Sequence, residues 1–273
     1  MAGVWDSWSA RLAAQAGFAT LFVSGYAVSA TLLGVPDIGL LTQPEMADAA
    51  RRVCAAVPHT EVVVDADTGY GGPANVARTV ELWESAGAAG LFLEDQVWPK
   101  RCGHMAGKQV VERDEWLAKL KTALEVRRHL HVTARTDARA VHGVQEAIVR
   151  AKAAADLGVD AVFVEAPESE AELAQVAEAL PGVVLVANMV ETGRTPLLTP
   201  PELSAYGVRL IVSPLSGLFA ATRALSDAYA SLRAEGSLRH HLHELVTFDQ
   251  FAGVVAPVVD GAADSAPEGT NRA

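Results

Sequence analysis

Short apolar, β-branched runs alternate along the chain with alanine-rich segments of helical periodicity. Seven runs have the length and composition of buried strands: residues 19–23, 61–64, 90–93, 130–133, 161–164, 183–186 and 209–212. Helices are predicted around them at residues 7–17, 73–85, 113–128, 144–157, 168–180, 200–206 and 217–235. Since every crossover is long enough to hold a helix, the pattern predicts an α/β fold built from βα units with a parallel sheet.

A polar group follows each predicted strand. These groups are Ser24-Gly25, Asp65-Ala-Asp67, Glu94-Asp95, Arg135-Thr-Asp137, Glu165-Ala-Pro167, Asn188-Met-Val-Glu191 and Ser213-Pro-Leu-Ser216. In a (β/α)₈ TIM barrel all these positions meet at the C-terminal rim, where the active sites of this fold lie. An open doubly wound sheet would instead use mainly the loops at one switch point. We therefore predict a (β/α)₈ barrel.

The two ends of the chain depart from this regular pattern. Residues 1–6 resemble only the end of an eighth strand, because helical periodicity begins at Ser7, so we expect the first strand to be truncated. Beyond the helix at 217–235, a second helical segment is expected to run through His240, Leu245 and Phe248. Residues 260–273 have no apolar face. We expect one barrel domain over residues 1–259 and a disordered tail over 260–273.

Composition narrows the possible partners. The chain has 273 residues, half of them hydrophobic, and a formal net charge of −11, which disfavours nucleic acid as a partner. No apolar run reaches the length of roughly 18 residues that a membrane span needs, and the N-terminus lacks the pattern of a secretory signal. Two cysteines, Cys54 in a helical segment and Cys102 in a polar loop, fit free thiols in a reducing compartment. We expect a cytoplasmic protein.

Two carboxylates and a glycine cluster follow the strand at 61–64. Asp65 and Asp67 are two residues apart, so strand alternation points them to the same side, and the glycines at 69–72 let backbone approach a ligand closely. Glu94 ends the next strand and adds a third carboxylate. Hard divalent ions such as Mg²⁺ bind such groups together with water and substrate oxygens. A solvated turn is the alternative for the Asp-Gly stretch taken alone.

The sequence Lys-Arg-Cys-Gly-His at residues 100–104 places a thiol among cations. A structural zinc site is disfavoured because no second cysteine pair lies at ligand spacing. A buried inert thiol and a reactive thiol remain, and neighbouring cations favour the reactive one because they lower a thiol pKa. Arg135 and Asn188 are candidates for binding a substrate carboxylate, with a salt bridge or a loop-anchoring hydrogen bond as the alternative for each.

Several of these stretches together resemble the isocitrate lyase and phosphoenolpyruvate mutase superfamily. The matching stretches are residues 23–25, 33–37, 65–71, 94–96, 100–104, 134–138, 164–166 and 187–189. Residues 92–100 and 102–105 are most similar to the petal death protein group of dimethylmalate lyases and oxaloacetate hydrolases. Residues 188–196 are similar to that group and to the carboxyphosphonoenolpyruvate phosphonomutases. Phe22 and Arg194 depart from the methylisocitrate lyase pattern.

The resemblance implies a barrel whose last helix is exchanged between subunits, a homotetramer built as a dimer of dimers, and Mg²⁺ or Mn²⁺ as cofactor. The implied metal ligands are Asp65, Asp67 and Glu94. The residues assigned to substrate binding are Ser24, Gly25, Tyr26, Gly103, Arg135, Asn188 and Ser216. The residues assigned to catalysis are Asp37, Lys100, Cys102, His104 and Glu165.

The expected activity is cleavage of the C2–C3 bond of a 2-hydroxy dicarboxylate of the malate type, such as 2,3-dimethylmalate, with oxaloacetate hydrate as a second substrate. Cys102 is expected to protonate the released enolate, and the loop over residues 96–108 is expected to close over the site. The alternatives are a phosphonomutase that forms a P–C bond, a methylisocitrate lyase, and a barrel that binds a dicarboxylate without turnover.

Overall fold

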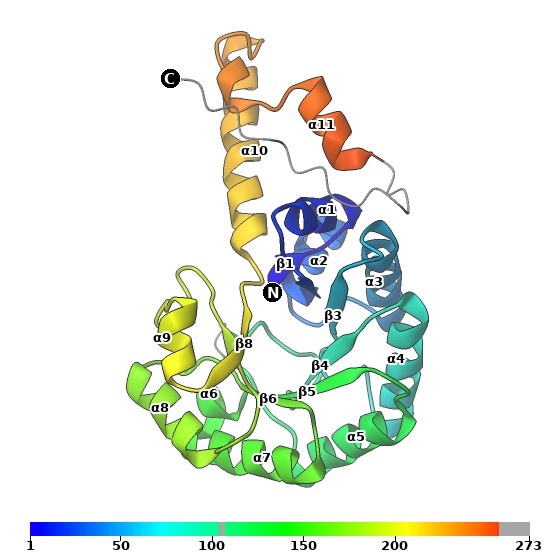
Figure 1. Cartoon of the computed structure of the whole chain (residues 1–273), viewed down its shortest axis with the longest axis vertical. Coiled ribbons are helices and arrows are strands. Elements are labelled where there is room, and N and C mark those ends of the chain that lie inside the picture. The colour runs from blue at the N-terminus through cyan, green and yellow to red at the C-terminus, as the bar shows by residue number, and fades with distance from the viewer. Residues whose placement is uncertain (104–106, 257–273) are drawn as a thin grey trace.

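Eight parallel strands form one sheet in the order of the chain. The strands are β1 (Ala2–Val4), β2 (Thr20–Val23), β3 (Glu61–Asp65), β4 (Gly90–Glu94), β5 (His131–Thr136), β6 (Ala161–Val164), β7 (Leu185–Asn188) and β8 (Val208–Val212). In this computed structural model, which describes residues 1–103 and 107–256, a bridge between Ala2 and Ser213 joins the last strand to the first. The predicted (β/α)₈ barrel is therefore confirmed (Figure 1).

The eighth strand expected at residues 1–6 is β1, which has three residues and pairs with β2. The backbone N–H of Gly3 donates to the carbonyl of Ser213 at 2.9 Å, so this short strand completes the hydrogen bonding between the ends of the sheet. A side chain at Gly3 would place its Cβ 2.1 Å from the carbonyl oxygen of Pro214, which is why glycine stands there.

Helices surround the strands (Figure 1). They are α1 (Ser7–Gln15), α2 (Gly25–Val28), the π-helical turn η1 (Ser29–Leu33), α3 (Gln43–Ala56), α4 (Pro73–Ala86), α5 (Arg113–Val126), α6 (Ala138–His142), α7 (Val144–Leu157), α8 (Glu170–Ala179) and α9 (Pro200–Ala205). The sequence analysis gave no bounds for α3, although it placed Cys54 in a helical segment. The periodicity missed α2, η1 and α6, because each is too short to show a repeat. The predicted bounds of α7 agree with the structure at both ends.

Strand residues alternate between two cores. Outward residues such as Leu21, Val62 and Leu91 pack with Met46, Trp83 and other side chains of the helices. Inward residues form a separate cluster inside the barrel: Phe22, Val63, Phe92, Ala161, Phe163, Val186 and Val212. The barrel interior is thus filled with side chains, as expected for eight strands.

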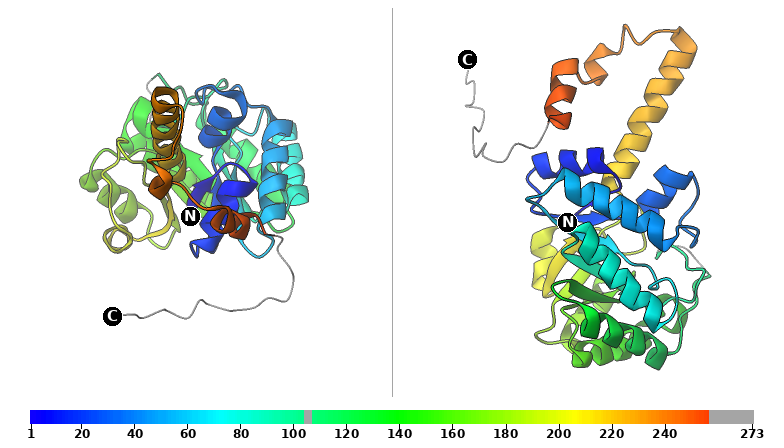
Figure 2. Two further views of the ribbon diagram at one scale, coloured as in Figure 1. Left: turned by 90° about the horizontal axis from the view of Figure 1, so that it is seen from above. Right: turned by 90° about the vertical axis from the view of Figure 1, so that its right-hand side faces the viewer.

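The C-terminal region stands away from the barrel. Helix α10 (Ser216–Glu235) projects from the end of β8, and Figure 2 shows most of its length clear of the other elements. One helical segment was expected through His240, Leu245 and Phe248. The structure instead has two short elements, the 3₁₀ turn η2 (Leu242–Glu244) and the helix α11 (Phe248–Val255). Helix α11 packs on α1. The tail expected over 260–273 lies outside the described residues.

Two further observations concern the expected surroundings of the chain. In the part of the chain that the structure describes, none of the helices combines the length and the apolar character that a membrane span requires. Within the same residues neither Cys54 nor Cys102 takes part in a disulfide.

A buried carboxylate joins α4 to the loop before β5. Glu84 accepts hydrogen bonds from the backbone N–H groups of Arg128 and His129 at 2.7 and 3.0 Å and from the Arg128 side chain at 2.8 Å. Burial raises the pKa of Glu84, but these hydrogen bonds outweigh burial and lower it to about 2. The ionised side chain therefore stabilises the connection between the two units.

We predict that Glu84→Gln lowers the free energy of unfolding by about 2 kcal/mol at pH 7, because charged hydrogen bonds contribute about that much. The folded-state pKa lies below the ordinary value of 4.5, so the stabilisation is complete above about pH 4.5 and is lost as the pH falls through about 2. Urea unfolding at pH 7 and pH 2.5 measures both, with the exposed Glu81→Gln as control. An equal difference between wild type and Glu84→Gln at the two pH values would contradict this role.

Candidate active site

A layer of polar side chains lies directly above the inward apolar layer of the barrel. Phe22, Val63, Phe92, Phe163 and Val186 belong to the interior cluster, and each is followed two residues later by a polar residue. Those residues are Ser24, Asp65, Glu94, Glu165 and Asn188. Since side chains two residues apart in a strand point to the same face, all five are directed toward the barrel axis at the C-terminal rim. Four polar residues lie within their strands and do not follow them as the sequence suggested: Asp65 in β3, Glu94 in β4, Arg135 in β5 and Asn188 in β7.

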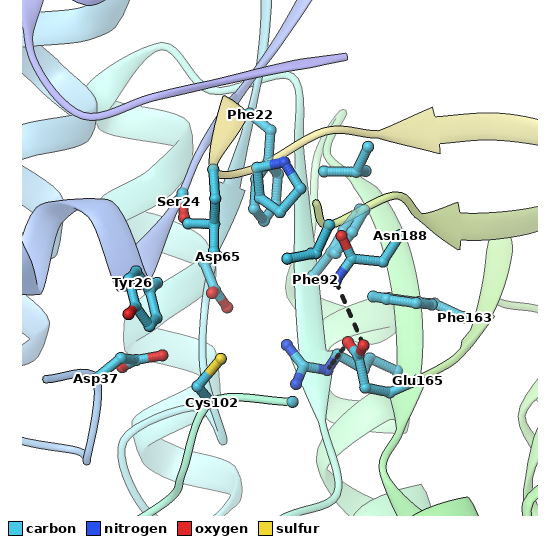
Figure 3. A pocket seen from close by; sticks show the side chains of 16 residues that line it. Phe22, Ser24, Tyr26, Asp37, Asp65, Phe92, Cys102, Phe163, Glu165 and Asn188 are labelled. Carbon is cyan, nitrogen blue, oxygen red and sulfur yellow. Dashed lines mark hydrogen bonds and ion pairs between the residues drawn. The ribbon is translucent and has the colours of Figure 1, made fainter. Parts of the chain in front are cut away.

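A small pocket opens at this rim (Figure 3). Its lining comprises Phe22, Ser24, Tyr26, Asp37, Asp65, Phe92, Cys102, Gly103, Arg135, Phe163, Glu165, Asn188, Val190, Val212, Pro214 and Leu215. The cavity volume is about 40 Å³, enough for about three water molecules. In Figure 3 the sulfur of Cys102 points into the pocket, between Asp37 and Glu165 and toward Asp65. The lining groups therefore face one common space.

Lys100 forms a buried cluster with two of the predicted carboxylates. Its Nζ lies 2.6 Å from Asp37 Oδ1 and 2.7 Å from Asp67 Oδ1. Burial lowers the pKa of Lys100, but these carboxylates outweigh burial and raise it well above its usual range. Lys100 is therefore a fixed positive charge beside the pocket.

Arg135 holds a second cluster. Its guanidinium lies 3.1 Å from Glu94, 3.0 Å from Asp137 and 3.3 Å from Glu165. Asn188 Nδ2 donates to Glu165 Oε1 at 3.3 Å, and the guanidinium carbon lies 5.6 Å from the centre of the Phe163 ring. Burial raises the pKa of Asp137, but Arg135 and Lys108 outweigh burial and lower it to about 2. Arg135 thus forms ion pairs with three carboxylates, and Asn188 joins this network by a hydrogen bond to one of them, Glu165.

Negative charge exceeds positive charge at the rim. Among the described residues the buried carboxylates there are Asp37, Asp65, Asp67, Glu94, Asp95, Asp137 and Glu165, and the buried cations are Lys100, Lys108, Arg135 and Arg150. The consequence falls on two of the predicted metal ligands. Burial raises the pKa of Asp67 to about 7, although Lys100 opposes the shift, and burial raises that of Glu94 well above its usual range despite Arg135.

The predicted metal ligands fit a hard divalent cation in their chemistry. Asp67 Oδ1 and both Glu94 carboxylate oxygens are buried without a hydrogen bond, although cations lie within ion-pair distance. A Cβ on Gly25 would lie 3.0 Å from Asp65 Oδ2 and 3.4 Å from Asp67 Oδ1, so both aspartates approach the same point and glycine leaves it open. In the described residues no three acidic, histidine or cysteine side chains gather into a ready metal site, because Lys100 and Arg135 lie among them.

Three consecutive residues of the cysteine loop are held through their backbone. Gln96 accepts from the N–H of Arg101 at 2.9 Å and donates to its carbonyl at 2.8 Å. The N–H of Cys102 donates to the carbonyl of Asp37 at 3.1 Å. Lys108 Nζ donates to the carbonyl of Gly103. The thiol is therefore carried by a fixed segment of the loop.

Most of the residues predicted from the sequence meet at this place, with two exceptions. Ser216, the first residue of α10, does not line the pocket, and its hydroxyl donates a hydrogen bond to Glu191. His104 lies outside the described residues. Gly25, Asp67, Glu94 and Lys100 lie just behind the lining and contact it through Asp65, Asp37 and Arg135.

Sequence reasoning gave no role to four buried polar residues of the rim: Asp95, Gln96, Lys108 and Asp137. Asp95 accepts from the hydroxyl of Thr136 at 2.6 Å and from the N–H of Asp137 at 2.8 Å, and it pairs with Arg150. Asp95 and Gln96 directly follow Glu94, so their position after a strand was a signal. Lys108 carries no such signal, because it follows no strand and its carboxylate partner, Asp137, is 29 residues away in the sequence.

The chain is similar to known proteins over most of its length. The family model described as phosphoenolpyruvate phosphomutase matches residues 1–233. The chain is 48% identical over 260 residues to a chloroplastic carboxyvinyl-carboxyphosphonate phosphorylmutase of Arabidopsis thaliana, covering 93% of this chain and 76% of that protein. It is 47% identical over 258 residues to the petal death protein of Dianthus caryophyllus, covering 94% and 81%.

Solved structures agree. A crystal structure of 2,3-dimethylmalate lyase superposes with a TM-score of 0.89 at 37% identity, covering 93% of this chain and 85% of that one. A phosphonopyruvate hydrolase in complex with oxalate and Mg²⁺ superposes with a TM-score of 0.83 at 28% identity, covering 93% and 88%. The chain therefore belongs to the phosphoenolpyruvate phosphomutase family and is an enzyme of the isocitrate lyase and phosphoenolpyruvate mutase superfamily.

Proposed function

We propose that this enzyme is a Mg²⁺-dependent lyase that cleaves the C2–C3 bond of a malate-type 2-hydroxy dicarboxylate such as 2,3-dimethylmalate. The products are a 2-oxo acid and a second carboxylate. The observation that carries the proposal is the thiol of Cys102, which lines the same small pocket as Asp65 and Arg135. The enolate formed by bond cleavage needs a proton donor at this place. Oxaloacetate hydrate is a second substrate, because its geminal diol matches the C2 hydroxyl.

Asp65, Asp67 and Glu94 would hold the metal ion, Mg²⁺ or Mn²⁺. The buried oxygens without a hydrogen bond and the surplus of carboxylates at the rim support this assignment. When bound, the ion supplies Lewis-acid chemistry that makes the C2 hydroxyl of the substrate more acidic. Asp37 and Lys100 complete the charge balance on one side of the site, since Lys100 contacts both Asp37 and Asp67.

Arg135 and Asn188 are assigned to the substrate carboxylates, with Ser24, Tyr26 and Gly103 as further contacts. Arg135 is the one cation among the described lining residues, so a dicarboxylate is matched by Arg135 and the metal site together. A tricarboxylate such as methylisocitrate would need a further cation. The remaining wall contains Phe22, Phe92 and Phe163, with ring centres 4.9 and 5.7 Å apart along the row. This apolar wall favours substrates with small alkyl substituents at C2 or C3.

Cleavage proceeds as a reverse aldol step. The proton of the C2 hydroxyl passes to a pocket-lining carboxylate, which we assign to Asp37, the C2–C3 electron pair passes to C3, and C2 becomes the carbonyl carbon of the 2-oxo acid. The resulting enolate of the second carboxylate takes a proton at C3 from the Cys102 thiol. After C3 is protonated, the proton held by Asp37 returns to the Cys102 thiolate. Glu165, held by Arg135 and Asn188, lines the opposite side of the pocket (Figure 3). The apolar wall keeps water from the enolate.

P–C bond formation of the phosphonomutase type is the second candidate. The 48% identity to a protein named carboxyvinyl-carboxyphosphonate phosphorylmutase favours it. The two reactions differ in product: a phosphonomutase gives a phosphonate signal in phosphorus NMR and leaves the carbon skeleton of malates intact. Turnover of a panel of 2-alkylated and 3-alkylated malates, oxaloacetate and methylisocitrate with Mg²⁺ decides between them.

Replacing the thiol tests the proton donor. Cys102→Ser should lower kcat for the best malate of the panel by roughly 10²-fold or more, because a hydroxyl is a far weaker acid at neutral pH. Binding of oxalate, measured by calorimetry with Mg²⁺ present, should change by less than about threefold, since the charges of the site are untouched. Cys54→Ser, at a half-buried position on α3, is the matched control. Full lyase activity in Cys102→Ser would contradict the role.

Metal binding can be measured without turnover. Mn²⁺ titration followed by electron paramagnetic resonance should give one site per chain in the wild type. Glu94→Gln should weaken it at least tenfold, because one of the buried anionic ligands becomes neutral. Glu84→Gln, which removes a buried carboxylate far from the rim, is the control. Unchanged Mn²⁺ affinity in Glu94→Gln would contradict its assignment as a ligand.

We also propose that α10 is exchanged between subunits in a dimer, and that two dimers form a tetramer. Along α10, Phe219, Leu225, Tyr229 and Leu232 are exposed, and of its 20 residues only Leu218 is buried. A groove of about 640 Å³ between α1 and α10 is lined by Trp8, Leu12 and Phe18 on one side and by Ala220 and Ala224 on the other. Exposed apolar area of this extent is typical of a subunit interface.

Light scattering coupled to size exclusion tests the assembly. The wild type should elute at the mass of four chains, and Leu225→Glu with Tyr229→Glu should reduce it, since two charges would enter an apolar contact. Ser226→Glu, on the same helix at an exposed polar position, is the control. A wild-type mass of one chain at micromolar concentration would contradict the exchange.

A further inference from the structure

Lys108 is a buried lysine that takes no part in the proposed chemistry. Lys108 is 8% exposed. Its Nζ lies 2.7 Å from Asp137 Oδ1 and also donates a hydrogen bond to the carbonyl of Gly103. A buried ammonium group is costly unless charge and hydrogen bonds compensate for lost water. Here the compensation comes from one carboxylate of the barrel and one carbonyl of the cysteine loop, so Lys108 joins the two.

The partner of Lys108 is also the partner of Arg135. Asp137 accepts from Arg135 Nε at 3.0 Å through Oδ2 and from Arg135 Nη2 at 3.3 Å through Oδ1. Gly103 itself lies against the same arginine, because a Cβ there would be 2.7 Å from Arg135 Nη2 and 2.5 Å from Glu165 Cδ. Gly103, Lys108, Asp137 and Arg135 therefore form a closed ring of contacts next to the thiol.

The neighbouring anchors of the loop differ from Lys108 in kind. Gln96 holds Arg101 by two neutral hydrogen bonds, and the carbonyl of Asp37 holds the N–H of Cys102. Neither reaches the Arg135 network. Lys108 is the anchor that fixes the Cys102–Gly103 peptide to the groups that bind the substrate carboxylate. A displacement of about 1 Å at a reacting group can cost about 10²-fold in rate, so such an anchor matters for a proton donor.

We propose that Lys108 is a positioning residue that sets the Cys102 thiol against the substrate by tying the carbonyl of Gly103 to Asp137; this rests on the proposed role of Cys102. If Lys108 were only a counter-ion for Asp137, a different result would be expected. Removing a counter-ion would lower stability but leave the exposure of the thiol unchanged, because Gln96 and Asp37 still hold the loop.

Alkylation of the thiol by iodoacetamide separates these two roles without any assay of turnover. In the full-length enzyme without substrate, peptide mass spectrometry follows Cys102, with Cys54 as internal reference; burial raises the pKa of Cys54 to about 11. Lys108→Met should raise the rate at Cys102 about tenfold or more, as expected for loss of a charge-assisted hydrogen bond. Lys119→Met removes another buried lysine, whose Nζ lies 3.4 Å from the Thr68 carbonyl, and should leave the rate unchanged.

An unchanged alkylation rate at Cys102 in Lys108→Met would overturn the proposal, and so would an equal rise in Lys119→Met. If Lys108→Met fails to fold, Lys108→Gln, which keeps a donor and loses the charge, serves the same comparison with an expected smaller rise. With the best malate of the panel, kcat of Lys108→Met should fall at least tenfold and KM should change less than threefold. If the wild type showed no lyase activity on any malate, the proposed function would be disproved. The alkylation result would still decide whether Lys108 holds the Cys102–Gly103 peptide in place.

Discussion

A buried ion-pair network at the C-terminal rim fixes the geometry of the site. Charges removed from water must be compensated by partners, and at this rim the buried carboxylates outnumber the buried cations among the described residues. Lys100 contacts two carboxylates and Arg135 contacts three, so each of these cations is fixed by more than one neighbour. A barrel with eight strands in order provides these positions, because the rim brings one polar residue from each of several strands to the axis.

The same network explains how one short loop becomes part of the site. The loop enters through Lys100, whose charge is needed by Asp37 and Asp67, and it is fixed again by Lys108 on Asp137. Between these two points Cys102 reaches the pocket, and Gly103 fits only because it has no side chain. The chemistry of the thiol therefore depends on charges that belong to the barrel. The surplus of negative charge that remains is what a divalent cation would balance.

Much of this arrangement could be predicted from the sequence. Strands buried on both faces read as apolar runs, and the polar residues that end them, such as Asp65, Glu94 and Glu165, identify the rim. Ser216 follows the same rule but hydrogen-bonds to Glu191, because the rule gives a strand end and not the direction of the side chain in the loop beyond it. Lys108 and Asp137 could not be paired from the sequence, because they are 29 residues apart and no periodic pattern links them. Short helices such as α2 and α6 lack the length that periodicity needs.

The activity proposed for this enzyme is cleavage of the C2–C3 bond of a malate, followed by protonation of the product carbon. Proton and carbon NMR of 2,3-dimethylmalate incubated with the enzyme and Mg²⁺ in D₂O tests it most directly. The account predicts equal amounts of pyruvate and propionate, the propionate carrying one deuterium at C2. An intact carbon skeleton for every malate of the panel, together with a phosphonate signal from a phosphoenolpyruvate-type substrate, would contradict it.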